Sequence, residues 1–341
     1  MLKRVVCFGE ILLRLSAPGR ETLLQSPFLQ VHVGGAEANV AVSLANFGHA
    51  VAMASTLPDN ALGSAAVAEL RKHGVATDPI ARTPGRMGSY FYTAGAGHRP
   101  SEVLYDRADS AFARARAVSY DWATLLAGAR MLHLSGITPA LGQATSDAAL
   151  AAARAARAAG ALVSFDGNYR AKLWACWDGD PRTSLHALLS EADIAFADHR
   201  DIGLVLGGLP GINEASPRQR FELAAQAAFA AFPRLQRIAT TVRIQDSVDH
   251  HRLGAMLTSR DGPLHVLDEI SLGGIVDRIG TGDAFAAGVL HGILTGMDDA
   301  HSLAFGLAAG CLKHYVPGDF NLVSINDVME LVNGERLDVR R

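Results

Sequence analysis

The sequence has few cysteines, no block of basic residues and no long apolar run. Its three cysteines, Cys7, Cys176 and Cys311, are far apart, so they fit neither a disulfide framework nor a CxxC metal site, and they suit a reducing compartment. A net charge of -3 and an isoelectric point near 6.5 offer little attraction for nucleic acid or an anionic membrane. No segment approaches the ~20 apolar residues of a membrane span. We therefore expect a soluble, cytoplasmic protein that binds small molecules, with no nucleic-acid or membrane partner.

Short apolar runs alternate with longer helical patterns along most of the chain. This rhythm predicts an α/β protein with a parallel sheet covered by helices. No repeat, linker or change of composition divides the chain, so we expect one domain over residues 1–341. The expected strands are 4–9, 51–56, 131–135, 162–166, 194–197, 238–242 and 253–258. The expected helices are 36–47, 61–73, 141–159, 217–231, 283–294, 300–315 and 325–332, several of them ended by glycine.

Two segments break this rhythm, residues 12–33 and 88–107. Both alternate like antiparallel strands, and neither contains a helical pattern. Together they predict a small second sheet beside the main one. Such a sheet would serve as a lid over a pocket from which water must be excluded, while an ordinary excursion of the main sheet is the alternative.

The clearest local motif is a glycine-rich turn, Gly280-Thr281-Gly282, followed by Asp283 and an apolar helix. Small residues let backbone N–H groups approach an anion, and the helix dipole favours negative charge at this end, so the turn suits phosphate. A carboxylate beside a phosphate repels it unless the carboxylate has a role such as accepting a proton. A simple helix-capping aspartate is the alternative interpretation of Asp283. Neither a Walker A loop nor a GxGxxG dinucleotide fingerprint is present.

A second glycine motif lies near the start of the chain, where Gly34 and Gly35 precede Ala36-Glu37-Ala38-Asn39. Adjacent glycines would let a ligand lie against the backbone. A tight turn between a strand and a helix, which needs glycine only for its backbone angles, is the alternative.

These two motifs, in this order, resemble the pfkB, or ribokinase-like, carbohydrate kinases. The stretch from Asp277 to Asp283 matches the D-x-x-G-x-G-D string of that family, which supplies the anion hole and the catalytic aspartate. The resemblance implies a three-layer α/β/α core with a small β-sheet lid, and ATP and Mg²⁺ as cofactors. It also implies Asp283 as the catalytic base, with Gly280, Thr281 and Gly282 around the transferring phosphate. The strand end at Asp277 and Arg278 would lie near a monovalent cation, although a surface ion pair between these two residues is the alternative.

Four strings most resemble the 2-keto-3-deoxygluconate kinases of this family: GGAEANVAV, VLYDR at 103–107, DGNYRAKLW at 166–174 and VPGDFN at 316–321. An acidic sugar needs a cation, and arginine offers a bidentate fork to a carboxylate. The alternatives are a surface ion pair for each arginine and strand packing for each tyrosine. The resemblance places at the substrate Gly34, Gly35, Asn39, Tyr90, Tyr105, Arg107, Asn168 and Arg170.

The nucleotide side departs from the family pattern. The N-x-x-E element that organises Mg²⁺ and phosphates corresponds here to Asp198-His199-Arg200-Asp201, in which both ends differ. Asp198 and Asp201 are candidates to hold Mg²⁺ through waters, and a capped helix start is the alternative. The usual K-x-G-x-x-G loop is missing after the late strand, where Arg243 is the candidate nucleotide-binding residue together with Gly280 and Gly282.

The functional hypothesis is therefore an ATP-dependent kinase that converts 2-keto-3-deoxygluconate to its 6-phosphate. A kinase for a neutral sugar of the fructose or ribose type is the first alternative, because it would share Asp283 but not need paired arginines. A sugar-binding relative that has lost phosphoryl transfer is the second, and a nicotinamide dehydrogenase is a weaker third. An exposed apolar lid also predicts a homodimer formed through the lid.

Overall fold

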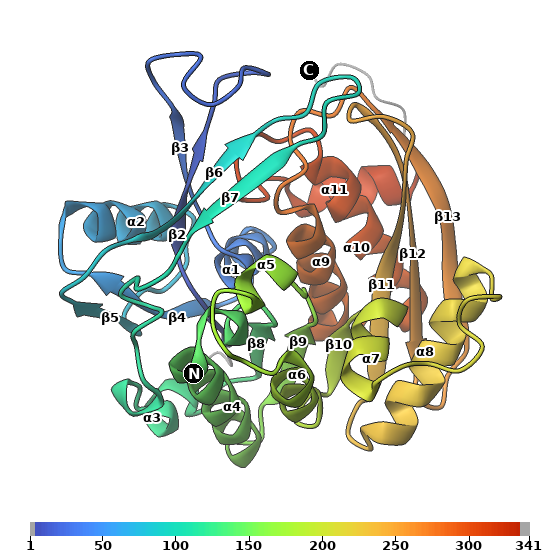
Figure 1. Ribbon diagram of the computed structural model, residues 1–341. Helices are drawn as coiled ribbons and strands as arrows, with labels where there is room; N and C mark the ends of the chain where they lie inside the picture. Colours follow the sequence, from blue (N-terminus) through green and yellow to red (C-terminus); the bar gives the residue numbers. More distant parts are fainter. Residues whose placement is uncertain (1–3, 335–341) are drawn as a thin grey trace.

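The computed structural model describes residues 4–334, so residues 1–3 and 335–341 of the expected domain lie outside the described residues. A nine-stranded sheet is sandwiched between two layers of helices, and a four-stranded sheet stands apart from it (Figure 1). The large sheet has the order β13-β12-β11-β10-β9-β8-β1-β4-β5, and among its described strands only β12 runs in the opposite direction to the others. Its strands are β1 (Val5–Phe8), β4 (Val51–Pro58), β5 (Ile80–Thr83), β8 (Met131–Ser135), β9 (Leu162–Asp166), β10 (Ile194–Phe196), β11 (Arg237–Gln245), β12 (His250–Ser259) and β13 (Leu264–Gly273).

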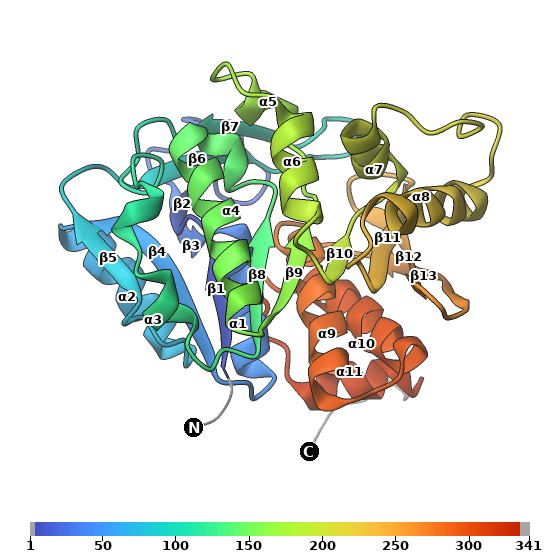
Figure 2. The same ribbon diagram turned by 90° about the horizontal axis from the view of Figure 1, so that it is seen from below.

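The helices form two layers, one on each face of this sheet (Figure 2). One layer contains α1 (Ala36–Asn46), α2 (Ala61–Lys72), α9 (Thr281–Thr295), α10 (Asp299–Lys313) and α11 (Ile325–Val332). The other contains α3 (Trp122–Leu126), α4 (Gln143–Ala158), α5 (Ala171–Trp174), α6 (Pro181–Leu189), α7 (His199–Leu206) and α8 (Pro217–Ala231). Short 3₁₀ turns occur at Ala117–Ser119 and Pro139–Leu141. The predicted three-layer α/β/α core is confirmed.

The central strand β1 shows why two apolar cores form. All four of its side chains are buried. Successive side chains of a strand point to opposite faces, so Val5 and Cys7 join the core beneath α1 and α9, whereas Val6 and Phe8 join the core beneath α4.

The small sheet has the order β3-β2-β6-β7, from β2 (Leu12–Ser16), β3 (Gln30–Gly34), β6 (Gly88–Thr93) and β7 (Glu102–Asp106). Its strands fall in the two segments predicted from sequence, and β3 extends one residue further. Strands β2 and β6 are parallel, and the other pairs are antiparallel. On the inner face Leu12, Tyr90 and Tyr92 pack together and contact Ile279, which precedes the glycine-rich turn. That face therefore lies over the turn, as a lid would.

Most predicted elements are present with ends shifted by a few residues, but several elements were missed. Only one of the ten positions of β13 is buried and five are exposed, so its apolar pattern is too weak to be recognised in sequence. Helices α6 and α7 are short, of 9 and 8 residues; α6 was not predicted, and only the capped start of α7 was considered, as the alternative for Asp198 and Asp201. Within residues 4–334, none of the helices combines the length and hydropathy needed to cross a membrane. That the chain is one domain stays a prediction.

Candidate active site

A cavity of about 390 Å³ lies between the lid and the carboxyl ends of the main parallel strands. Its wall includes side chains from the lid, from α1, from the ends of β7 and β9, and from the first turn of α9. A second cavity of about 410 Å³ lies next to it, and both are lined by Asp166, Asn168, Arg170 and Gly282. Two ligands could therefore lie side by side, with the start of α9 between them.

The glycine-rich turn forms the start of α9. Gly280 is the residue before the helix and has a φ of 79°, in the left-handed region that favours glycine. A Cβ atom there would lie 2.1 Å from the backbone oxygen of Asp319, so no larger residue fits. A Cβ atom on Gly282 would meet no atom of another segment within 4 Å, and Gly282 lines both cavities. The turn thus offers free amide groups to both cavities, as an anion site requires.

Asp283 lies in the first turn of α9 and lines the first cavity. The Nδ2 of Asn39 donates a hydrogen bond of 2.6 Å to its Oδ2. Burial raises the pKa of Asp283 to about 7, the bond from Asn39 opposes that rise, and the nearby Glu37 carboxyl adds to it. A carboxylate that is half ionised near neutral pH and held by one donor is suited to accept a proton from a ligand hydroxyl.

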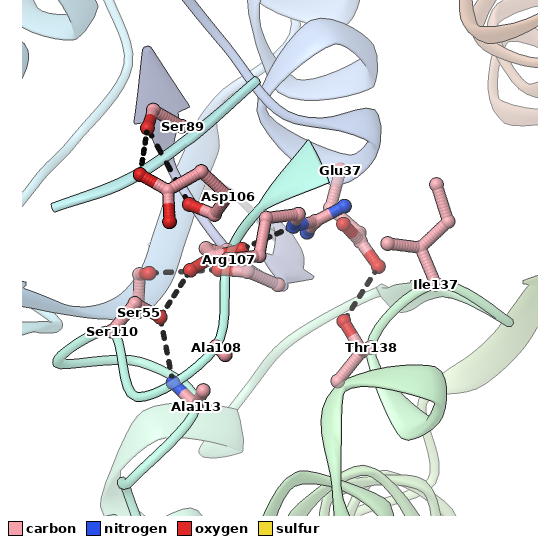
Figure 3. Close-up of polar contacts among 12 residues, drawn as sticks. Glu37, Ser55, Ser89, Asp106, Arg107, Ala108, Ser110, Ala113, Ile137 and Thr138 are labelled. Atoms are coloured by element: carbon pink, nitrogen blue, oxygen red, sulfur yellow. Dashed lines mark hydrogen bonds and ion pairs between the residues drawn. The ribbon is translucent and has the colours of Figure 1, made fainter. Parts of the chain in front are cut away.

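Arg107 follows β7 and is buried, with an exposed fraction of 6%. Its Nε donates to Oε2 of Glu10 at 2.6 Å, and Glu10 also accepts from the Ser110 hydroxyl. Figure 3 shows the side chains of Arg107 and Glu37 next to each other, with Thr138 bonded to Glu37 at 2.9 Å. Glu10 therefore fixes the arginine, whose two Nη groups form no hydrogen bond within residues 4–334 and remain available to the cavity.

Three further arginines line the first cavity: Arg170, Arg243 and Arg278. Burial lowers the pKa of Arg243, and repulsion from Arg278 and Arg170 lowers it further. Within residues 4–334 Arg243 forms neither a hydrogen bond nor an ion pair, and Arg278 contacts only Gln245, at 3.5 Å. Arg170 is exposed and bonds only the oxygen of Tyr169, at 3.1 Å. Arg170 lies close enough to Asp166, Asp201 and Asp283 to lower the pKa of each of them. Arg243 and Arg278 repel each other and form no ion pair within residues 4–334, so their positive charge favours an anionic ligand in this cavity.

The other predicted substrate residues gather at the same cavity, with one exception. Tyr90, Tyr105, Asn168 and Gly35 line it. Gly34 is not among the lining residues, because it packs against the side chain of Asp319, whose Cγ would be 2.6 Å from a Cβ at this position. The role of Gly34 is therefore to allow this close packing.

Asp198 and Asp201 line the second cavity and also cap α7. The Asp198 carboxylate accepts hydrogen bonds from the backbone amides of Arg200 and Asp201, and it forms an ion pair with the Arg200 guanidinium. The Asp201 carboxylate accepts a hydrogen bond from the backbone amide of Asp198 at 3.1 Å. The capping interpretation is thus confirmed, and the metal role stays a prediction. In the described part of the chain, no three His, Cys, Asp or Glu side chains form a complete metal site.

The oxygen donors at this cavity fit a nucleotide-bound Mg²⁺ that keeps most of its waters. Burial raises the pKa of Asp166 well above its ordinary value, and repulsion from Asp283 and Asp201 adds to that rise. Burial likewise raises the pKa of Asp201 to about 6. Such crowded carboxyl groups would gain from a divalent cation between them.

Sequence reasoning missed Glu10, gave Asp166 no role of its own, and considered Arg278 only for a cation site or a surface ion pair. Glu10 comes two residues after β1 and Asp166 is the last residue of β9, and polar residues at the carboxyl ends of parallel strands are the signal that could have identified them.

The doubly covered parallel sheet, the amide-lined turn and the carboxyl group beside it define a phosphotransferase that acts on a small polyhydroxy substrate. The model of the pfkB family of carbohydrate kinases matches residues 2–321. The chain belongs to this family and is a carbohydrate kinase.

Individual relatives agree with this family. A 2-dehydro-3-deoxygalactonokinase of Haloferax volcanii is 34% identical over 338 residues, which cover 98% of each chain. A 2-dehydro-3-deoxygluconokinase of Bacillus subtilis is 27% identical over 93% of this chain and 91% of its own. The crystal structure of 2-dehydro-3-deoxygluconokinase from Thermotoga maritima superposes with a TM-score of 0.90 and 38% identity, and covers 97% of this chain and 100% of that one.

Proposed function

We propose that this kinase transfers the γ-phosphoryl group of ATP to the 6-hydroxyl of 2-keto-3-deoxygluconate, the compound also called 2-dehydro-3-deoxygluconate. The observation that carries the proposal is Asp283, bonded to Asn39, in a cavity shared by the glycine-rich turn and unpaired arginines. The names of the similar kinases support the substrate class.

In this reaction the sugar oxygen forms a bond to the γ-phosphorus, and the bond from that phosphorus to the bridging oxygen of ADP breaks. Asp283 takes the hydroxyl proton and later releases it to water. The amides of Gly280, Thr281 and Gly282 face the phosphoryl oxygens, and positioning and electrostatics supply the rate enhancement without a covalent enzyme intermediate. The lid residues Tyr90 and Tyr105 cover the sugar and keep water away.

Mg²⁺ would be held by the triphosphate and by waters facing Asp166, Asp198 and Asp201, and it would neutralise nucleotide charge. Arg243 and Arg278 line the first cavity, where they would supply fixed positive charge to the transferring phosphate in place of the missing K-x-G-x-x-G loop. A tight hairpin between β11 and β12, paired up to Gln245 and His251, stands in place of that loop.

Substrate choice rests on the two arginines at the sugar side. A sugar carboxylate would bind Arg170 and the Nη groups of Arg107, because Glu10 occupies only the Nε of Arg107. A neutral sugar would offer neither arginine a carboxylate to bind.

An ADP-release screen tests this function, with ATP, Mg²⁺ and one sugar in each reaction. The highest kcat/KM is expected for 2-keto-3-deoxygluconate or its galactonate epimer, and comparing these two decides which hydroxyl configuration fits. A higher value for fructose or ribose would refute the acidic substrate. Sugar binding without ADP release would show a non-catalytic relative.

We also propose a homodimer formed through the outer face of the lid. Val31, Leu15, Phe91 and Leu104 form an apolar row across all four strands, because each is the register partner of the next. Val31 and Leu104 are 57% and 58% exposed. Strands β3 and β7 are also open edges of this sheet. A second copy of the row would cover this surface.

Light scattering at working concentrations tests the dimer, and Leu104→Glu should produce a monomer because it places a charge in the apolar row. A monomeric wild-type protein would remove the proposal. We place the enzyme in the cytoplasm, where ATP is present and its three free cysteines stay reduced.

A further inference from the structure

A buried cluster of two cations and two carboxylates lies behind the glycine-rich turn: Arg14, Lys313, Asp277 and Asp319. Their exposed fractions are 2%, 0%, 8% and 2%. Arg14 contacts Asp277 Oδ2 at 2.7 Å through Nη2 and Asp319 Oδ1 at 3.4 Å through Nε. Lysine in particular is almost never fully buried unless its charge is matched. A fully buried lysine beside a catalytic turn therefore needs an explanation.

The ammonium group of Lys313 is bonded to backbone carbonyl groups. Lys313 ends α10, and its Nζ donates to the oxygens of Val316 and Gly318 at 2.9 and 2.8 Å. Burial lowers the pKa of Lys313 to about 8, while Asp277 and Asp319 oppose that change, so the amine is mostly charged at neutral pH. A charged ammonium with two carbonyl contacts resembles a monovalent cation in a carbonyl cage.

The loop held by Lys313 supports the glycine-rich turn directly. The amide of Gly318 donates to Asp277 Oδ2 at 3.0 Å, and the amide of Ile279 donates to the other oxygen of the same carboxylate at 3.0 Å. A Cβ atom on Gly280 would lie 2.1 Å from the oxygen of Asp319 and 3.4 Å from Cε of Lys313. The position of the turn is thus set by the loop 316–319, and the position of that loop depends on Lys313.

The residues at this place do not fit an additional monovalent cation. The carbonyl groups of Val316 and Gly318 already accept from Lys313, so they are not free to ligate an ion. Arg14 adds a second positive charge to the same cluster, so the two carboxylates are already balanced. An entering K⁺ or Na⁺ would meet two fixed cations.

We propose that the ammonium of Lys313 is the built-in monovalent cation of this kinase and positions the glycine-rich turn for phosphate in place of bound K⁺ or Na⁺. Lys313 is a positioning residue, because it acts through the loop 316–319 and does not line the cavity. The inference rests on the phosphoryl transfer proposed above. It does not depend on which sugar is the substrate.

The first experiment uses the wild-type enzyme, with its salts replaced by tetramethylammonium chloride and with Mg²⁺ held constant. Adding KCl or NaCl at constant ionic strength should change kcat by less than about twofold, a difference of ~0.4 kcal/mol in barrier. The melting temperature should not rise with K⁺, since a ligand stabilises a protein only by binding its folded form. A saturable activation of about tenfold or more by K⁺ would overturn the proposal. The melting measurement needs no sugar, so a wrong substrate does not affect it.

The second experiment replaces the charge with Lys313→Met, and exposed Lys72→Met on α2 is the matched control. The Lys313 variant should lose about 100-fold in kcat, comparable to the loss of one oxyanion donor, with a smaller change in KM for the sugar. K⁺ or NH₄⁺ should restore part of its activity and raise its melting temperature, whereas the Lys72 variant should behave as wild type. Full activity of Lys313→Met without added ions would refute the inference. If the variant does not fold, the wild-type ion titration still decides.

Discussion

Replacing Asp283 by Asn should remove catalysis while making the protein more stable. The amide can still accept the bond from Asn39 through its oxygen, but it then presents an NH₂ donor to the sugar hydroxyl and cannot take its proton. General-base catalysis contributes about 10²–10⁴-fold, so kcat should fall about 1,000-fold, or ~4 kcal/mol in barrier. Sugar affinity should change little, because the size and shape of the side chain are kept.

The gain in stability follows from the raised pKa of Asp283. The native pKa of about 7 exceeds the ordinary 3.8, so the native state holds a proton that the unfolded chain has lost at intermediate pH. The cost of the buried carboxylate is absent below about pH 4, grows towards pH 7 and is complete above it. A shift of about 3 units corresponds to ~4 kcal/mol, and partial exposure to the cavity reduces this to about 2 kcal/mol.

Two measurements check this prediction, with the exposed Asp268→Asn on β13 as the control. ADP release gives kcat, and urea unfolding at about pH 5 and pH 8 should show a larger stabilisation by Asp283→Asn at the higher pH. Wild-type kcat/KM should rise with pH up to about 7 and then level off, as the base ionises. An active Asp283→Asn enzyme, or unfolding energies equal to those of wild type at both pH values, would refute the reasoning.

Three other substitutions test separate parts of the site. Arg170→Ala should raise the KM for an acidic sugar by about tenfold or more and leave the KM for a neutral sugar unchanged, as measured by steady-state kinetics. An unchanged KM for the acidic sugar would favour a neutral substrate. Glu10→Gln should destabilise the fold by about 3 kcal/mol in urea unfolding, because Arg107 would keep a buried charge without its partner; a loss below about 1 kcal/mol would contradict the buried pair. Gly280→Ala should lower kcat about 100-fold, because the added carbon would clash with the backbone oxygen of Asp319 and displace the turn. An unchanged kcat would show that the turn tolerates displacement.

The parts of the site that were predicted from sequence are those encoded locally. Gly280 to Asp283 lie at the start of one helix, so the motif alone places an amide-lined turn next to a carboxylate. The two lid segments show strand alternation within themselves, which is why the small sheet was predicted at nearly its observed bounds. Asn39 and Asp283 could be linked only through the family resemblance, since their bond joins residues at opposite ends of the chain.

The parts that were missed depend on contacts between distant segments. Glu10 pairs with Arg107, which is 97 positions away in the sequence, and the local sequence around either residue does not identify its partner. Lys313 in the last turn of a helix resembles the common exposed lysine that complements a helix dipole. Only the fold shows that this side chain is turned inward onto the loop 316–319.

The lid and the glycine-rich turn are connected through one carboxylate, Asp319. Tyr90 of β6 lines the first cavity and donates to Asp319 Oδ2 at 2.8 Å, and Arg14 of β2 contacts the other carboxylate oxygen. The backbone of Asp319 in turn packs against Gly280. A displacement of the lid therefore changes the contacts of the residue that supports the phosphate turn. Because these groups are buried and closely packed, we expect sugar binding under the lid to align the turn, which would limit phosphoryl transfer to water when no sugar is bound.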